Sequence, residues 1–187
     1  MSSPTAPARR SDAKRNRVRI LAVAREAFLG GGGEPSMAEI ARRAGVGMAT
    51  LYRNFPGRAE LVEELYRSQV DDICAAAQAA QEDTPGESFL AWLRGFHQAG
   101  AQKGPLASLL LADSSDGSTV LNESRARVIT AGEPLLAAAQ QAGDVRDDVA
   151  LGEILDGVVA LSRVPSDPAS PGSMIQVLFD GLSQRRA

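Results

Sequence analysis

The chain has 187 residues, of which 44% are hydrophobic and 23% charged, and a formal net charge of −3. It is long enough to bury a core, and no run of eighteen apolar residues predicts a membrane span. Its single cysteine excludes an internal disulfide framework, and its polar, basic start resembles no secretory signal, so we expect a cytoplasmic protein.

The net charge hides an asymmetry along the chain. Residues 1–67 hold 12 Lys and Arg against 7 Asp and Glu, whereas residues 68–187 hold 8 against 16. Seven basic residues lie between Arg9 and Arg25. We interpret residues 1–12 as a disordered basic tail, and the basic residues that follow as part of a helix that approaches phosphates.

Alanine, leucine, arginine and glutamate dominate, and the residues typical of strands are sparse, so the sequence predicts an all-α fold of about nine helices. The first helix carries Ile20, Ala24, Ala27 and Phe28 on one face and ends at the glycine run 30–33. That run has no Gly-Lys-Ser/Thr behind it and no strand before it, which favours a turn over a phosphate-binding loop.

Two short helices follow. Ser36 and Glu39 have the spacing of a capping box at the start of the second helix, and Gly45 is typical of the left-handed residue that closes a helix. The third helix lies within "GVGMATLYRNFPGR" and ends before Pro56, which disfavours helical geometry at Phe55.

Six more helices are expected in the rest of the chain, where Gly132 and Pro134 are expected to bend the fourth of them. Their approximate ranges are 58–81, 88–102, 105–112, 120–141, 147–163 and 173–185.

The second and third helices, joined by a tight turn at residues 45–47, predict a helix-turn-helix whose second helix enters the major groove of DNA. Leu51 and Phe55 would face inward. Arginine can bond guanine, asparagine can bond adenine, and hydroxyl groups reach phosphates. The alternative is a surface helix whose polar residues only face water. The predicted DNA-binding residues are Lys14, Arg15, Arg17, Ser36, Met37, Met48, Ala49, Thr50, Tyr52, Arg53, Asn54 and Arg58.

The segment "PSMAEIARRAGVGMATLYRNFPGRAELVEELYR", behind "RILAVAREAF", closely resembles the DNA-binding domain of TetR-type transcriptional regulators. The most specific match is Thr50, Leu51, Tyr52 and Phe55, followed by the basic Arg58. The resemblance covers residues 18–67, and the family often has glycine or serine at position 49 and histidine at position 54.

The resemblance implies a DNA-binding domain at residues 13–57 and a ligand-binding and dimerisation domain at residues 58–187. It also implies a repressor that binds a palindromic DNA operator as a homodimer and is released by a small-molecule effector. We expect that effector to be mostly apolar or aromatic.

Two further residue sets are predicted in the larger domain. In both, the alternative is ordinary core, because a shared apolar face does not identify what covers it. The ligand-pocket set is Cys74, Trp92, Phe96, His97, Leu109, Leu110 and Val128. The dimer-interface set is Leu151, Ile154, Leu155, Val158, Ile175, Leu178, Phe179 and Leu182.

An enzyme is one alternative function. One histidine, one cysteine and the absence of a Gly-x-Ser-x-Gly motif make a catalytic triad or a metal site hard to assemble. Asp147 and Asp148 are adjacent and are interpreted as a helix start. We therefore predict no catalytic residue, no metal ligand and no cofactor. A helical protein-interaction module that does not bind DNA is the other alternative.

Overall fold

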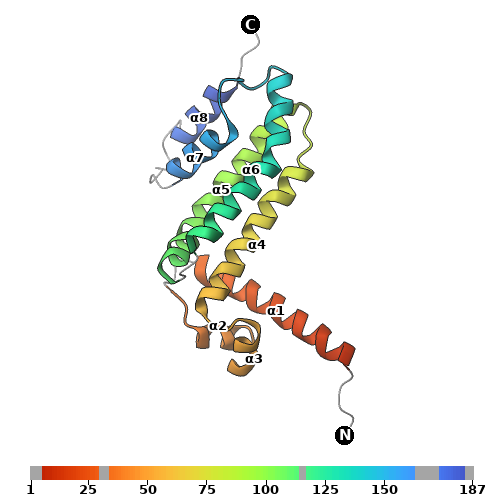
Figure 1. Ribbon diagram of the computed structural model, residues 1–187, viewed down its shortest axis with the longest axis vertical. Coiled ribbons are helices and arrows are strands. Elements are labelled where there is room, and N and C mark those ends of the chain that lie inside the picture. The colour runs from red at the N-terminus through yellow and green to blue at the C-terminus, as the bar shows by residue number, and fades with distance from the viewer. Residues whose placement is uncertain (1–5, 30–33, 114–116, 163–172, 184–187) are drawn as a thin grey trace. The chain divides into compact units, whose positions relative to one another are not determined.

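The computed structural model describes residues 6–29, 34–113, 117–162 and 173–183. Over these residues the chain is all-α, as predicted, and contains no strand beyond one isolated bridge between Val145 and Ser183 (Figure 1). The helices are α1 (Ala6–Leu29), α2 (Met37–Arg43), α3 (Met48–Asn54), α4 (Arg58–Ala79), α5 (Pro85–Asp113), α6 (Gly117–Gln141), α7 (Leu151–Leu161) and α8 (Met174–Leu182).

These helices form two compact units. The first consists of Met1–Arg67 and Pro105–Ser118, and the second of Ser68–Gly104 and Thr119–Ala187. α4, α5 and α6 contribute residues to both units. The sequence predicted a domain boundary between residues 57 and 58. It did not predict that the end of α5 belongs to the first unit.

In the first unit, α1 contacts both α2 and α3 around a small apolar core. The predicted face of α1 is buried, and Ile40 and Leu51 are fully buried beside it on α2 and α3. α1 begins at Ala6, so it includes part of the segment interpreted as a tail, and residues 1–5 lie outside the described residues.

The turn between α2 and α3 has the geometry that its glycine predicts. Gly45 has φ = 62°, in the left-handed region where a side chain would be strained. Its N–H donates to the Arg42 carbonyl, and the N–H of Val46 donates to the Ala41 carbonyl at 3.0 Å. These two bonds satisfy carbonyls at the end of α2, so the chain can turn sharply into α3.

In the second unit, α4, α5 and α6 run side by side (Figure 1). The indole N–H of Trp92 on α5 donates to the Ile73 carbonyl of α4 at 3.2 Å, and Arg127 of α6 pairs with Asp71 of α4. Gly132 lets Trp92 approach α6 closely, because a Cβ atom at this position would overlap the indole ring. These contacts fix the register of the three helices.

Two predicted helices, 88–102 and 105–112, are one helix in the structure. α5 continues through Gly104 and Pro105 to Asp113. A proline inside a helix removes one hydrogen bond, but most of the stability of a helix in a protein comes from the packing of its apolar face. Leu106 and Leu110 continue that face and are both fully buried. α6 likewise remains one helix through Gly132 and Pro134.

A bilayer-spanning helix, which needs both length and low polarity, is not found in the part of the chain that the structure describes.

Candidate nucleic-acid interface

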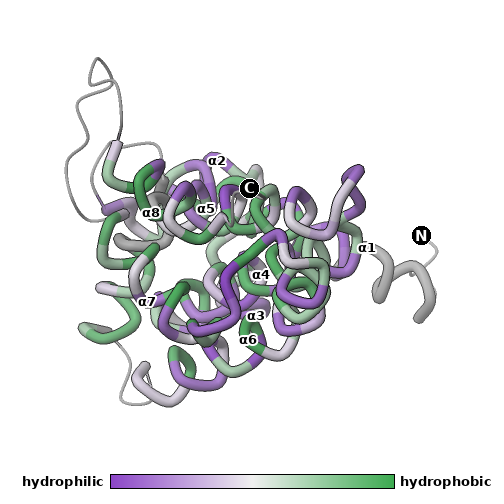
Figure 2. Tube along the Cα trace, turned by 90° about the horizontal axis from the view of Figure 1, so that it is seen from above, coloured by the Kyte–Doolittle hydropathy of each residue, from purple (hydrophilic) through white to green (hydrophobic). Residues whose placement is uncertain are grey.

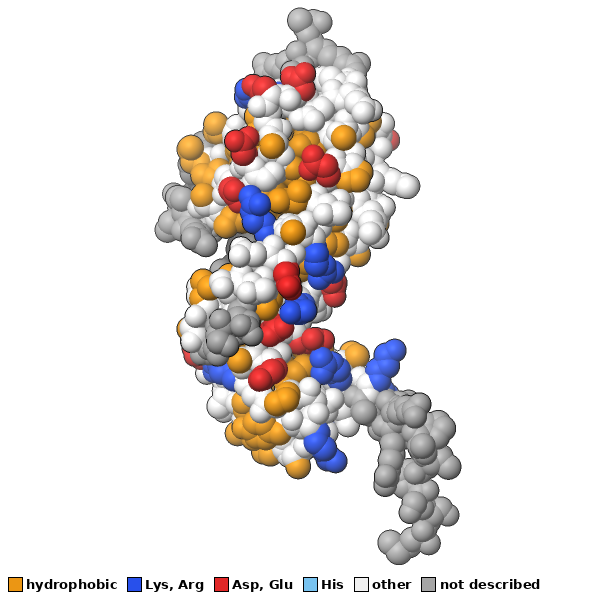
Figure 3. Space-filling view, viewed as in Figure 1, with side chains coloured by type: hydrophobic (Ala, Val, Ile, Leu, Met, Phe, Trp, Pro, Cys, Tyr) orange, Lys and Arg blue, Asp and Glu red, His pale blue; other side chains and the backbone are white. Residues whose placement is uncertain are grey.

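The short helix α3 has one buried face and one exposed face. Leu51 and Phe55 are buried, as predicted, and fix α3 on the core of the first unit. On the opposite face Met48 is 39% exposed and Tyr52 is 46% exposed. Figure 3 shows hydrophobic side chains gathered on this surface beside a basic one. The exposed face of α3 is therefore available to a groove of DNA.

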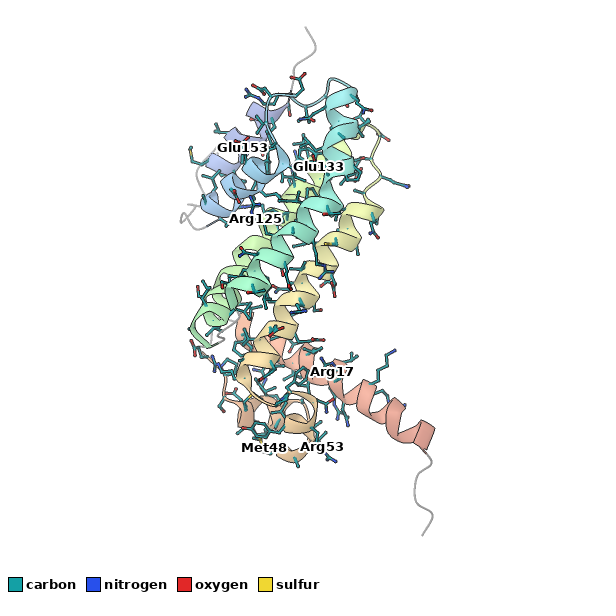
Figure 4. The ribbon with its side chains drawn as sticks, viewed as in Figure 1. Arg17, Met48, Arg53, Arg125, Glu133 and Glu153 are labelled. Atoms are coloured by element: carbon teal, nitrogen blue, oxygen red, sulfur yellow. The ribbon has the colours of Figure 1, made fainter. Side chains whose placement is uncertain are left out.

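The polar side chains of α3 bond mainly to their own helix. Arg53 Nε donates to the Ala49 carbonyl at 3.0 Å, and Nη2 donates to Thr50 Oγ1 at 3.2 Å. Asn54 Nδ2 donates to the Thr50 carbonyl at 2.8 Å. The bonds of Arg53 are exposed, so DNA can replace them at little cost. Figure 4 shows Met48 and Arg53 at the exposed side of this helix.

The remaining predicted contact residues lie on α1, on α2 and at the start of α4. Lys14 and Arg15 are exposed on α1. The Ser36 hydroxyl caps α2 by accepting the Glu39 N–H at 3.2 Å, and Met37 is half-buried in the first turn. The Ser36 hydroxyl therefore has a capping role in the structure.

Arg58 has a structural role in the first unit. Its guanidinium donates to the Pro35 carbonyl at 3.2 Å and to the Glu34 carboxylate at 2.6 Å. It also lies 5.3 Å from the centre of the Phe28 ring. These contacts join the segment before α2 to the start of α4 and to α1. The prediction of Arg58 as a DNA contact did not foresee them, because its partners lie far away in the sequence.

Arg17 also contacts protein rather than solvent alone. Its guanidinium reaches Asn54, Phe55 and Glu64, which lie on or next to α3 and on α4. The structure thus gathers Met48, Ala49, Tyr52 and Arg53 on one exposed surface and gives Arg17 and Arg58 partners within the unit. Glu64 was missed, because no local sequence signal links it to Arg17.

The seven predicted pocket residues are divided between the two units. Leu109 and Leu110 belong to the first unit, whereas the other five belong to the second. Trp92 is buried between Phe89 and Phe96, with its ring centre 6.2 Å from each of theirs. Val128 is buried and Cys74 is half-buried. His97 is half-buried, with Nδ1 2.9 Å from Ser162 Oγ.

Two open cavities among the described residues lie elsewhere in the second unit. One, of about 430 Å³, is lined by residues 80–85, Ser88, Leu135 and Ala138. The other, of about 340 Å³, is lined by residues 146–148, Gly181 and Ser183. None of the predicted pocket residues lines either of them. The aromatic side chains around Trp92 therefore fill core space in this state.

Gln69 is a polar residue that the sequence reasoning missed. Its side chain is 8% exposed, and its Oε1 has no hydrogen-bond partner among the described residues. It lies one helical turn before Ile73, whose carbonyl accepts the Trp92 N–H. A buried oxygen without a hydrogen-bond partner destabilises the folded state by about 1–3 kcal/mol. A hydrogen-bond donor that reached Oε1 would remove this penalty. The signal in the sequence is a glutamine on the apolar face of α4.

The predicted interface residues of α7 are buried within their own chain. Leu151, Ile154, Leu155 and Val158 are all buried, with Val158 0% exposed. They therefore offer no free surface, and their common spacing reflects a core-facing stripe.

On α8, which contacts α7, the predicted stripe is only partly covered. Phe179 and Leu182 are buried, while Ile175 and Leu178 are half-buried. Hydrophobic residues make up most of both helices (Figure 2). The exposed apolar residues are Met174 at 62% and Val177 at 56%, with Val159 of α7 at 37%, and none of these three was predicted.

The adjacent Asp147 and Asp148 do not start a helix as interpreted, because α7 begins at Leu151, and Asp148 is engaged in an ion pair instead. Arg146 Nη2 donates to Asp148 at 2.6 Å, and this bond holds the pKa of Asp148 below its usual range. A carboxylate of this kind stays ionised and is a poor general acid. Within the described residues, no group of three or more His, Cys, Asp or Glu side chains could hold a metal ion.

Comparison with known proteins gives a consistent result over both units. Residues 20–65 match the model of the bacterial regulatory proteins of the tetR family. Residues 84–184 match the C-terminal domain described as that of SbtR-like transcriptional regulators. None of the curated proteins matches the sequence.

Two solved structures are similar over nearly the whole chain. A TetR transcription regulatory protein from Mycobacterium vanbaalenii is 33% identical, with a TM-score of 0.73 over 94% of this chain and 99% of its own. A TetR transcriptional regulator from Streptomyces coelicolor is 30% identical, with a TM-score of 0.69 over 89% of this chain and 98% of its own.

Proposed function

Because this chain belongs to the TetR family of bacterial regulatory proteins, we propose that it is a homodimeric repressor released from a palindromic operator by a small molecule. Its membership makes it a DNA-binding transcriptional regulator and not an enzyme. The repressor role, the operator, the dimer and the effector are the parts that we propose.

The exposed face of α3 is the observation that carries the proposal. Met48 and Tyr52 are exposed there, and among the described residues Arg53 makes exposed bonds to its own helix. In the groove, Arg53 would exchange these bonds for a guanine or a phosphate. The Tyr52 hydroxyl would bond a phosphate, and Met48 would contact a base edge or a thymine methyl group.

The exposed apolar residues of α8 support a dimer. Met174 and Val177 stand on the side of α8 away from the buried Phe179 and Leu182. One recognition helix reads too few base pairs for useful specificity, and a second copy related by a two-fold axis doubles the site. A second copy of α8 is therefore the occupant that we assign to this surface.

Gln69 supports an effector site inside the second unit. An apolar or aromatic molecule with one hydrogen-bond donor would satisfy Oε1 while contacting the surrounding core. Such a molecule releases DNA only if it binds the DNA-free state more tightly than the DNA-bound state. By linkage, operator DNA must weaken the binding of the molecule by the same factor.

A gel-shift series across genomic fragments, including the region upstream of its own gene, tests the proposal. We expect a small set of fragments to bind, with an affinity that falls steeply as salt rises because Lys and Arg displace counterions. The Arg53→Ala variant should lose affinity for those fragments before it loses affinity for the other fragments. Equal affinity for all fragments, or an affinity that does not change with salt, would contradict specific DNA binding by α3.

A further inference from the structure

Arg17 belongs to α1, but its guanidinium lies at the end of α3. Nη1 donates to the carbonyl of Asn54, the last residue of α3, at 2.9 Å. Nη2 lies 2.9 Å from Oε1 of Glu64 on α4, and Cζ lies 4.5 Å from the centre of the Phe55 ring. One side chain therefore contacts the recognition helix, the residue that ends it and the helix that follows (Figure 4).

Making these contacts together uses a property that arginine has and lysine lacks. The guanidinium is planar, so it can donate in its plane while its face lies over an aromatic ring. The Asn54 carbonyl is one of the groups at a helix C-terminus that have no partner in the helix, and a cation stabilises that end. Phe55 is 1% exposed, so its ring is a fixed support for the stacked group.

We propose that Arg17 is a positioning residue of the recognition helix and not a phosphate ligand. Its guanidinium fixes the C-terminal end of α3 against α1 and α4, so that Tyr52 and Arg53 meet the groove together. The proposal rests on the proposed binding of a specific DNA site by α3. It separates Arg17 from Lys14, which is exposed on the same helix and is the better candidate for a phosphate contact.

Three variants separate the two roles. Arg17→Lys keeps the positive charge but loses the planar guanidinium group, and Arg17→Gln loses both. Lys14→Gln is the control for a phosphate contact. Each is titrated by fluorescence anisotropy, at several salt concentrations, with a duplex enriched by this protein from a random pool and with a shuffled duplex. Circular dichroism and melting curves confirm that each variant is folded.

We expect Arg17→Lys and Arg17→Gln both to weaken binding to the enriched duplex by roughly tenfold. Binding to the shuffled duplex and the slope of log K against log salt should remain those of the wild type. Lys14→Gln should instead lower the slope by about 0.9. The proposal is overturned if Arg17→Lys binds like the wild type while Arg17→Gln lowers the slope as Lys14→Gln does.

Glu64→Gln adds a test in which the two roles predict different results. If Arg17 positions α3, losing its ion pair with Glu64 lowers the ratio of specific to non-specific affinity. If Arg17 binds phosphate, removing a competing carboxylate strengthens binding to both duplexes equally, and that result would refute positioning.

A measurement without DNA keeps this proposal separate from the proposed function. In Arg17→Gln, the amides of residues 51–55 should exchange hydrogen at least tenfold faster than in the wild type, while those of α6 keep their rates. Unchanged exchange at the end of α3 would rule out positioning. A wild type that binds no duplex would instead contradict the proposed function and leave the exchange result as the test of Arg17.

Discussion

At the scale of single residues, the recognition surface depends on side chains that are held weakly before DNA binds. Arg53 bonds to the Ala49 carbonyl and to Thr50 Oγ1, both within its own helix and both exposed. Exposed bonds of this kind contribute little to stability, because water replaces them readily. The side chain can therefore serve recognition without a structural role.

The variant Arg53→Ala tests this separation. Specific affinity should fall by about 1–3 kcal/mol if Arg53 bonds a guanine, and binding to shuffled DNA should fall less. The free energy of unfolding should stay within about 0.5 kcal/mol of the wild type. The measurements are duplex titration and urea denaturation. A large loss of stability would show that Arg53 supports the fold.

For a substitution of Gln69 we predict the opposite result, in which the stability of the fold rises and the function is impaired. Gln69→Leu removes the buried oxygen that has no partner and should raise the free energy of unfolding by about 1 kcal/mol. It should also abolish the response of DNA binding to a compound that wild-type protein selects from a screen monitored by Trp92 fluorescence. A less stable variant would indicate that Oε1 has a structural partner.

At the scale of elements, the turn between α2 and α3 sets the angle at which α3 leaves the core. Gly45 has φ = 62°, while Gly47 has φ = −71°, and an added Cβ atom would meet nothing within 4 Å at either position. The two glycines therefore differ in backbone conformation and not in available space.

Gly45→Ala and Gly47→Ala form a matched pair. Gly45→Ala should destabilise the protein by about 1–2 kcal/mol, because the left-handed conformation is strained for alanine. Gly47→Ala should change stability by less than about 0.5 kcal/mol. Thermal melts of both variants measure the difference. Equal melting temperatures would show that the turn relaxes to another conformation.

The sequence predicted these elements where the signal is local. The Gly45 turn and the inward Leu51 and Phe55 depend on neighbouring residues, and all of them are confirmed. What the sequence did not predict are contacts between segments that are distant along the chain. Neither the ion pair of Arg17 with Glu64 nor the continuity of α5 through Pro105 has a local signal, because both depend on what packs nearby. Likewise, the spacing of apolar residues on α7 could not show that its own chain covers them.

At the scale of the whole molecule, the proposed function requires two copies of the chain. α7 buries its apolar stripe within the chain, and the exposed residues of α8 are the surface that we assign to a partner copy. In a two-fold interface, one substitution changes the surface twice. A charge placed on the exposed face of α8 should therefore prevent association without unfolding the chain.

Val177→Asp and Val158→Asp separate the interface from the core. Val177 is 56% exposed, so its variant should stay helical and become monomeric in light scattering. Val158 is 0% exposed, so a buried charge there should cost several kcal/mol and unfold the protein. A dimeric Val177→Asp variant that keeps full DNA affinity would place the interface elsewhere.

The most direct test of the account is to select binding sites from a pool of random duplexes with wild-type protein and sequence them. We expect two inverted half-sites whose centres lie about 10 base pairs, or a multiple of that, apart, because two copies of α3 would enter successive major grooves. Selection with Arg53→Ala should lose the preference at one position in each half-site. A pool that gains no common sequence, or a single undivided site, would contradict a dimer that reads DNA with α3.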